Sequence, residues 1–387
     1  MAMKQDWANL DSLALNVILE KLIEPIDHIW FGSVCKNWHS IANLNHQNDR
    51  QFRSNILPML MIPMENSLEK RNLYSVLANR VYPFELTMLY KQRCCGSSHG
   101  WLATIDGDVI TWVNPFKDVA PIILPRIDVF ESFKNYYEFN VHKVTLSADP
   151  ISSPNDYVVA AIYTTSGCLA FIKARQEFWT YIDYTRHRGF IDVTFYKGLV
   201  YAVSRWKNIV SFDLCYSSDP SGKEKRIPNV LLLGGSDETY SPLTYLVKSL
   251  EGELWMVRRF VTIEDICNKD HNKGTHSFHV FKLEFDDKGE KLLGLLKLES
   301  LGDNVLFVGD NDPVSVSASY FSKYLQKDSI YYSDNYFDDE PVPYPEGPFD
   351  LGIYNLKDGR FGVHCPYKTY FKGKAPPIWV VPPFQWS

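Results

Sequence analysis

Residues 195–203 read Phe-Tyr-Lys-Gly-Leu-Val-Tyr-Ala-Val, and this short stretch predicts the fold of most of the chain. Aromatic and β-branched residues favour pleated strands. The Lys197-Gly198 pair between the two apolar runs is typical of a tight turn. Ile209 to Leu214 continues the pattern after a polar break. The stretch therefore predicts a β-hairpin followed by a third strand.

The same pattern recurs along the chain, as an apolar strand and a second strand that ends in a polar turn. The pairs are Gly100-Trp101-Leu102 with 109–112, 198–201 with 209–214, 252–255 with 278–283, and 329–332 with 351–356. Units that recur every few tens of residues indicate a β-propeller or a related array. We interpret each pair as an inner strand and its neighbour, and expect about six or seven blades. Because the spacing is irregular, we predict an irregular β-propeller; a pair of β-sandwiches is the alternative.

The bulk composition indicates a folded protein of more than one domain. The chain has 387 residues, of which 45% are hydrophobic, 22% charged and 14% aromatic. This length suits one small and one large domain, and the composition is that of a globular protein. A protein that binds duplex nucleic acid needs a basic face. The net charge of −6 therefore disfavours nucleic acid as a partner.

The cysteines and the N-terminus indicate a reducing compartment. The seven cysteines are odd in number and show no framework spacing, which disfavours disulfides. Met1 to Leu10 is polar and lacks the apolar core of a signal peptide. No apolar run approaches the roughly 20 residues that span a bilayer. We expect a protein of the cytoplasm or the nucleus, without a membrane partner.

Trp7 to Ala42 predicts three short helices. Asp11 or Ser12 can cap the first helix. Its apolar residues share one face: Leu15, Ile18, Leu19 and Leu22. Pro25 suits the first turn of a second helix, and Ser33 can cap a third. Three helices of this size bury little surface alone, so their apolar stripes either pack on one another or are covered by a partner.

The sequence therefore divides into three parts. Residues 5–45 form a small all-α unit of three helices, 46–56 a polar linker, and 57–387 a large all-β domain. A helical cap that only covers the following domain is the alternative interpretation of the first part.

The opening helices resemble an F-box. The resemblance lies in Trp7-Ala8-Asn9-Leu10-Asp11-Ser12-Leu13, in 17–22, and in Ser33-Val34-Cys35-Lys36-Asn37-Trp38. The closing Val-Cys-Lys-x-Trp string is its specific part. The family has a proline after the first leucine, where this chain has Asp11. Since aspartate can also cap that helix, we expect the fold to survive and some adaptor affinity to be lost.

The β domain is similar to a large plant F-box family that carries a kelch-like β-propeller after the box. The similarity lies in 95–102 (Cys-Gly-Ser-Ser-His-Gly-Trp-Leu), in Asn114-Pro115-Phe116, and in 376–382 (Pro-Pro-Ile-Trp-Val-Val-Pro). The last strand of a propeller commonly joins its first blade. Ile378 to Val381 is placed to do so, which would remove two exposed sheet edges.

The resemblance implies a non-catalytic substrate-recognition subunit of an SCF-type (Skp–cullin–F-box) ubiquitin ligase. Its partners would be a Skp-type adaptor, through it a cullin, and a target protein that the sequence does not identify. By the same resemblance, the adaptor-binding residues would be Leu10, Leu15, Ile18, Leu22, Val34 and Trp38.

Two small basic spots lie at predicted strand ends and are candidates for contact with the target. They are Arg205-Trp206 and Arg258-Arg259. Arginine and tryptophan are favoured at interface hot spots. A solvated rim is the alternative interpretation of both spots.

The sequence contains no convincing catalytic, metal or cofactor motif. Cys267, His271, His276 and His279 match no zinc spacing, and this segment is typical of a hairpin loop. Ser97-Ser98-His99 lacks the Gly-x-Ser-x-Gly elbow of a hydrolase. Two other functions stay open. One is a stand-alone propeller that binds or converts a ligand in its channel. The other is an F-box protein that no longer engages a ligase, given Asp11.

Overall fold

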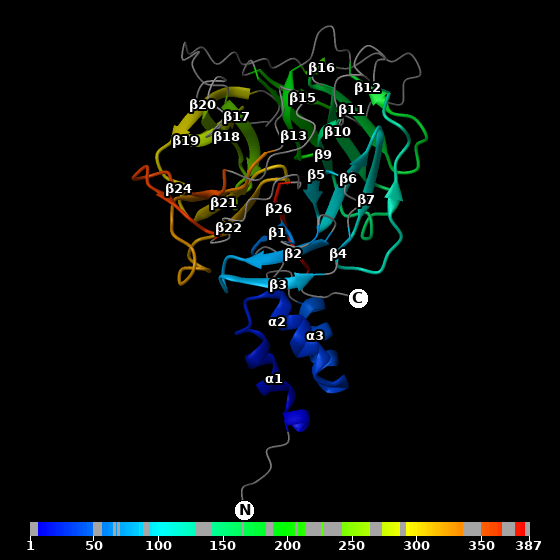
Figure 1. Cartoon of the computed structure of the whole chain (residues 1–387), viewed down its shortest axis with the longest axis vertical. Helices are drawn as coiled ribbons and strands as arrows, with labels where there is room; N and C mark the ends of the chain where they lie inside the picture. Colours follow the sequence, from blue (N-terminus) through cyan, green and yellow to red (C-terminus); the bar gives the residue numbers. More distant parts are fainter. Residues whose placement is uncertain are drawn as a thin grey trace, which may run out of the picture.

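The computed structural model describes residues 7–48, 56–64, 67, 70–84, 86–87, 93–128, 141–164, 166–182, 189–205, 208–213, 226–227, 242–263, 273–286, 292–335, 350–365 and 376–383. It shows three helices that project from the rim of a ring of six β-sheets (Figure 1). The predicted fold class, a small helical unit followed by a β-propeller, is confirmed. The number of blades is six, which lies within the predicted range.

The helical unit comprises η1 (Trp7–Asn9), α1 (Ser12–Leu19), α2 (Pro25–Ser33) and α3 (Lys36–Asn48). Asp11 caps α1, because its carboxylate accepts a hydrogen bond of 2.9 Å from the Ala14 N–H. Pro25 is the first residue of α2, as predicted. Ser33 does not cap a third helix: it ends α2, and its hydroxyl donates to the carbonyl of Trp30 at 2.8 Å. α3 also extends beyond the predicted boundary at residue 45.

Each sheet of the ring is one blade, and the blades follow one another in chain order. Blade 1 is β26 (Ile378–Val380), β1 (Met59–Pro63), β2 (Lys70–Ser75) and β3 (Arg80–Phe84), with β4 (Leu86–Thr87) beside β2. Blade 2 is β5 (Arg93–Ser98), β6 (Trp101–Asp106), β7 (Val109–Val113) and β8 (Ile122–Ile123). Blade 3 is β9 (Val141–Leu146), β10 (Val158–Tyr163), β11 (Cys168–Lys173) and β12 (Thr180–Tyr181).

The other three blades complete the ring. Blade 4 is β13 (Phe190–Tyr196), β14 (Leu199–Ser204), β15 (Ile209–Phe212) and β16 (Arg226–Ile227). Blade 5 is β17 (Pro242–Lys248), β18 (Leu254–Ile263), β19 (Lys273–Phe285) and β20 (Leu292–Leu298). Blade 6, in spatial order, is β22 (Val314–Ser317), β21 (Asn304–Val308), β23 (Ser329–Tyr332), β24 (Gly352–Asn355) and β25 (Phe361–Gly362).

The C-terminal strand closes the ring. β26 pairs antiparallel with β1, with Leu60 opposite Trp379, and it also contacts β5 of blade 2. The predicted pairing of the last strand with the first blade is therefore confirmed. Blade 1 is therefore built from chain segments far apart in sequence, and this pairing covers the edge that β1 would otherwise expose.

The predicted strand pairs form, but their position in the blades was misjudged. β6, β14 and β18 pair with β7, β15 and β19, and in each sheet they are the second and third strands. The innermost strands are β26, β5, β9, β13, β17 and β22, and in this order each contacts the next around the centre. The sequence pattern did not identify these strands as innermost, because two of them carry charged residues that the fold buries: Lys143 in β9 and Asp192 in β13.

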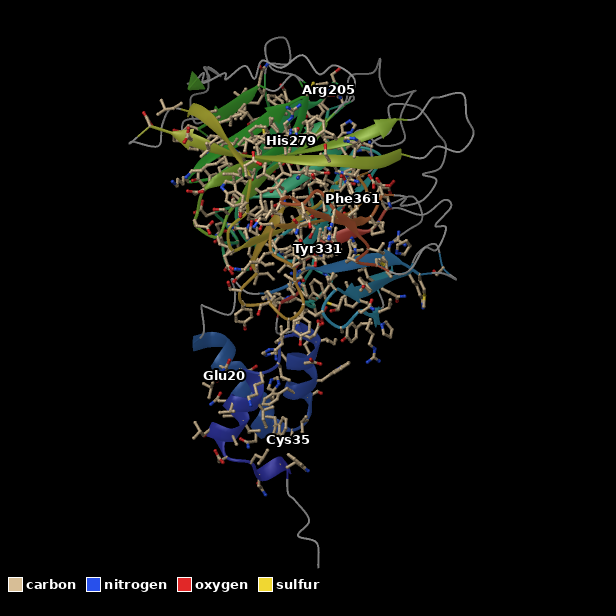
Figure 2. All side chains as sticks on the ribbon, turned by 90° about the vertical axis from the view of Figure 1, so that its left-hand side faces the viewer. Glu20, Cys35, Arg205, His279, Tyr331 and Phe361 are labelled. Atoms are coloured by element: carbon tan, nitrogen blue, oxygen red, sulfur yellow. The ribbon has the colours of Figure 1, made fainter. Side chains whose placement is uncertain are left out.

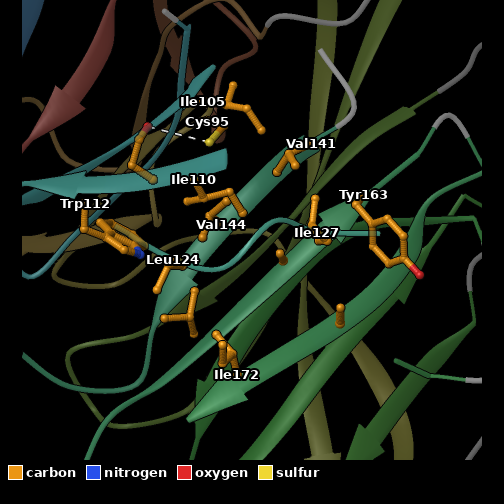
Figure 3. Close-up of a cluster of buried hydrophobic side chains, with 14 of the residues drawn as sticks. Cys95, Ile105, Ile110, Trp112, Leu124, Ile127, Val141, Val144, Tyr163 and Ile172 are labelled. Atoms are coloured by element: carbon orange, nitrogen blue, oxygen red, sulfur yellow. Dashed lines mark hydrogen bonds between the residues drawn. The ribbon is translucent and has the colours of Figure 1, made fainter. Parts of the chain in front are cut away.

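The hydrophobic core lies between neighbouring sheets. Figure 3 shows the cluster between blades 2 and 3, where Ile110 and Trp112 of β7 face Val144 of β9 and Ile172 of β11. All four of these side chains are buried. Since each blade buries both faces against its two neighbours, the ring is stabilised as a whole rather than blade by blade.

Candidate functional site

The three helices form a small core of their own. Leu15, Leu19, Phe31 and Ala42 make up this core, and Leu15 is 0% exposed. The adaptor-binding role predicted for Leu15 is therefore wrong for this fold, because its side chain is covered by its own helices. Leu10, Ile18, Leu22 and Trp38 are partly buried and pack against this core.

Other apolar side chains of the helical unit point outward. Val34 is 54% exposed, as its predicted role requires. Leu13 and Val17 are 73% and 45% exposed and lie four residues apart, on one side of α1. Trp7 of η1 is also exposed. We call Trp7, Leu13, Val17 and Val34 the exposed helical surface. The prediction missed Leu13 and Val17, although their spacing of four marks a second stripe on α1.

Trp38 holds the end of the helical unit together. Its indole N–H donates to the carbonyl of Trp7 at 3.0 Å, and its ring lies 4.5 Å from that of Phe31, centroid to centroid. Asn37 adds a bond of 3.4 Å to the carbonyl of Leu10. In Figure 2, Cys35 lies far from the propeller, at the end of the helical unit that Trp38 holds together, whereas Glu20 lies closer to the propeller. The Val-Cys-Lys-x-Trp string thus fixes the tip of the helical unit.

The opposite side of the helical unit packs on the propeller. Ile26 of α2 lies in a cluster with Met59 of β1 and Leu73 of β2. The ring of Trp30 meets that of Tyr82 edge-on, with 6.0 Å between centroids. The propeller therefore covers one side of the helices, and the exposed helical surface lies outside this junction.

A buried carboxyl group lies at this junction. Glu24, directly before α2, is only 8% exposed and accepts a hydrogen bond from the Ser75 hydroxyl of blade 1. Burial raises the pKa of Glu24, and the nearby charge of Asp27 raises it further, whereas the bond from Ser75 opposes them. The folded protein therefore binds a proton at Glu24 more readily than the unfolded chain does.

We predict that Glu24→Gln stabilises the protein relative to the wild type as the pH rises. A raised pKa in the folded state favours folding at low pH, and this contribution is lost as the pH rises through the folded pKa. The glutamine keeps an acceptor for Ser75 and carries no charge at any pH. Urea unfolding at about pH 4 and pH 8 measures the difference, which should be larger at pH 8. A difference that shrinks at pH 8 would contradict the assignment; Glu20→Gln, on the exposed end of α1, is the control.

The predicted target-binding residues have different environments. Arg205 is exposed in the turn after β14, Arg258 in β18 is half-buried, and Trp206 lies outside the described residues. Arg259 is 1% exposed and forms an ion pair of 2.6 Å with Asp350. It also donates to Thr275 and to the carbonyl of Ser333. The prediction of Arg259 as a target contact is therefore wrong, because this arginine joins blades 5 and 6.

Polar contacts cross the centre of the ring. Lys143 of blade 3 forms a buried ion pair with Asp192 of blade 4 and donates to the carbonyl of Asn311 at 3.1 Å, in blade 6. Burial raises the pKa of Asp192, whereas Lys143 and the Leu246 N–H stabilise its carboxylate.

A second pair of contacts extends this network. Thr145 donates to Asp312 at 2.7 Å, and the Asp312 N–H donates to the carbonyl of Ser97 in blade 2 at 2.9 Å. Blades 3 and 6 lie opposite each other in the ring, so these contacts connect the two sides of the propeller across its centre. This arrangement disfavours a ligand site at that level of the channel.

The remaining candidate motifs have structural positions. The Ser98 hydroxyl donates to the carbonyl of Leu146, and His99 occupies a turn with φ of 52°. His276 and His279 lie in strand β19 rather than in a loop, whereas Cys267 and His271 are outside the described residues. The described residues contain no group of three or more His, Cys, Asp or Glu that could hold a metal ion. None of the described helices has the length and apolar character that crossing a bilayer requires.

Fold and site together define a propeller protein with an N-terminal three-helix unit that exposes several apolar side chains. Residues 73–355 match the KIB1-4 β-propeller family. The chain belongs to the plant F-box protein family that carries this type of propeller. The predicted description of the β domain as kelch-like is therefore only approximate, because the matching family is the KIB1-4 β-propeller.

Relatives in Arabidopsis thaliana match over nearly the whole chain. The chain is 25% identical to F-box protein SKIP23, over 97% of this chain and 95% of that protein. It is 24% identical to putative F-box protein At5g55150, over 90% of each chain. It is 23% identical to F-box protein At2g17036, over 97% of this chain and 95% of that protein. The similarity therefore includes the helices as well as the propeller.

Proposed function

We propose that this protein is the non-catalytic substrate-recognition subunit of an SCF-type ubiquitin ligase. The helical unit binds a Skp-type adaptor and, through it, a cullin. The propeller binds a target protein and holds it near the charged ubiquitin-conjugating enzyme. Such proximity raises the effective concentration of a target lysine without any new bond made by this subunit.

The observation that carries this proposal is the exposed helical surface. Blade 1 covers Ile26 and Trp30 contacts Tyr82, yet Leu13, Val17 and Val34 remain exposed. Apolar side chains grouped on a small helical unit are typical of a protein interface. The similarity to F-box proteins along both parts of the chain supports the same conclusion.

The compartment follows from the same proposal. We place the protein in the cytoplasm or nucleus, where cysteines stay reduced. Among the described residues, Cys35, Cys94, Cys95, Cys168 and Cys365 are not joined in disulfides, which agrees with such a compartment.

Leu13→Glu combined with Val34→Glu should weaken binding of a Skp-type adaptor about tenfold or more, because two charges would be buried in an apolar contact. Both side chains are exposed, so the helices should still fold. Trp38 and Leu22 are less suitable positions, since both pack on the helical core. Co-purification with the adaptor and titration calorimetry measure the effect, and circular dichroism checks the fold.

Val363→Glu provides the matched control. Val363 is 70% exposed, but it lies beside β25 of blade 6, so its substitution should leave adaptor binding unchanged. If Leu13→Glu with Val34→Glu binds the adaptor as well as the wild type does, the exposed helical surface is not the contact. If the wild-type chain itself binds no adaptor, the alternative of an F-box protein without a ligase applies. Asp11, in place of the family proline, would then be the first position to restore.

A further inference from the structure

Blade 5 contains the two longest of the described strands, and they extend past their neighbours. β19 pairs with β20 only from Val280 onward, so its residues 273–279 have no partner among the described strands on that side. β18 pairs with β17 only as far as Phe260. Figure 2 shows this pair in yellow-green, crossing the width of the propeller beside the label of His279. The pair thus presents side chains beyond the body of the blade.

Three side chains gather on one face of the β18–β19 pair, where this extension begins. Arg258 of β18 stands opposite His279 of β19 in the strand register. The guanidinium carbon of Arg258 lies 5.1 Å from the centre of the Phe260 ring. The Phe260 ring meets the imidazole of His279 edge-on at 4.8 Å. We call Arg258, Phe260 and His279 the blade 5 surface.

Among the described residues, no negative charge neutralises Arg258. Arg258 is half-buried, and burial lowers its pKa. No carboxylate of the described residues forms an ion pair with it. Buried or partly buried cations are ordinarily paired, because the loss of water around them is costly. Arg258 is instead held in place by stacking on Phe260, which leaves its N–H donors available.

Besides Arg258, the charged groups among the described residues that act on His279 are Lys297 and Glu299. Burial and the charges of Lys297 and Arg258 lower the pKa of His279, so this imidazole is neutral near pH 7. Lys297 and Glu299 lie 3.9 Å apart and are both exposed. The two positive charges of Arg258 and Lys297 exceed the single negative charge of Glu299. The surface therefore favours an anionic partner, although the whole chain has a net charge of −6.

The register of β19 indicates contact through side chains rather than through the strand edge. Phe260 pairs with Ser277 and Val261 with Thr275, so His276 forms a bulge. A bulge bends a strand and disfavours the addition of another strand along it.

We propose that the blade 5 surface binds a carboxylate-bearing segment of the target protein. The carboxylate accepts hydrogen bonds from the guanidinium of Arg258, and an apolar neighbour in the segment packs on Phe260. Charge-assisted bonds of arginine to carboxylate are strong and directional, so one such contact can define the register of the bound segment. The assignment of this segment to a ubiquitination target rests on the proposed function. The binding of an acidic segment is independent of that function.

The test is selection of a random decapeptide library, displayed on phage, against the full chain in complex with its Skp-type adaptor. The enriched peptides should carry Asp or Glu next to an apolar residue. Arg258→Ala should weaken their binding about tenfold or more, as measured by fluorescence anisotropy. Arg360→Ala, at an exposed arginine of blade 6, should leave it unchanged. Raising the salt from about 50 to about 500 mM should weaken binding to the wild type more than to Arg258→Ala.

The outcomes separate this proposal from the proposed function. The proposal of an acidic segment is overturned if no peptide is enriched, if the enriched peptides lack acidic residues, or if Arg258→Ala binds them as well as the wild type does. It is also overturned if binding requires phosphorylated residues, or if the surface prefers nucleic acid or lipid vesicles. Arg258→Ala should still co-purify with the adaptor. Conversely, Leu13→Glu with Val34→Glu should lose the adaptor and, as an isolated full chain, still bind the acidic peptides.

Discussion

Asp192→Ala should destabilise the propeller by about 3–5 kcal/mol, the usual cost of removing one partner from a buried ion pair. Asp192 is 1% exposed and neutralises Lys143, which is 5% exposed. Without this carboxylate, the ammonium group of Lys143 stays in the centre of the ring, and its remaining acceptor among the described residues is the carbonyl of Asn311. The Leu246 N–H also loses its acceptor. The loss therefore affects blades 3, 4 and 5 together.

Urea unfolding of the full chain measures this loss. Lys282→Ala is the matched control, because Lys282 and Glu253 form an ion pair of 2.5 Å that is about one-third exposed on each side. Exposed pairs contribute at most about 1 kcal/mol, so this variant should be close to the wild type. Lys143→Met combined with Asp192→Leu should recover much of the stability, since it removes both charges. Equal losses for Asp192→Ala and Lys282→Ala would show that the central pair is not buried in solution.

Gly96→Ala should cost about 3 kcal/mol or more, at the upper end for an added methyl group. A Cβ atom at this position would lie 2.0 Å from the carbonyl oxygen of Val144. Gly96 is in β5 and Val144 in β9, so the innermost strands of blades 2 and 3 would have to separate. Because the obstacle is backbone, a change of side-chain rotamer cannot relieve the contact.

Gly274→Ala is the control for this substitution. Gly274 also lies in a strand, and nothing is within 4 Å of a Cβ atom built there. Alanine should be neutral or slightly stabilising at this position, because it reduces the freedom of the unfolded chain. A Gly96→Ala variant as stable as Gly274→Ala would contradict the close approach of β5 to β9. The comparison therefore tests whether position 96 requires glycine because β5 and β9 lie so close together.

Local signals predicted much of the architecture. The cap at Asp11, the start of α2 at Pro25 and the hairpin at Lys197-Gly198 were read from single residues and are present. Each depends on contacts within a few residues, where backbone chemistry decides the outcome. The pairing of 378–381 with the first blade was predicted from the resemblance, and the structure confirms it for β26.

The errors concern residues whose environment is made by distant parts of the chain. The sequence predicts Leu15 and Arg259 as contact residues, yet Leu15 fills the helical core and Arg259 pairs with Asp350. A stripe on a helix has the same pattern whether it faces its own neighbours or a partner. An arginine at a strand end likewise looks the same in sequence whether or not a carboxylate lies behind it.

The sequence by itself determined that three helices precede a β array, because periodicity, caps and turns act over a few residues. It also indicated the family, through the strings that resemble an F-box and its propeller, and the match to the KIB1-4 β-propeller family agrees with that resemblance. Only the tertiary structure decided which strands line the centre, that Lys143 meets Asp192, and that no carboxylate of the described residues pairs with Arg258. The physical reason is that ion pairing and burial depend on distances in space, and closing a ring of six blades joins residues that no local pattern relates.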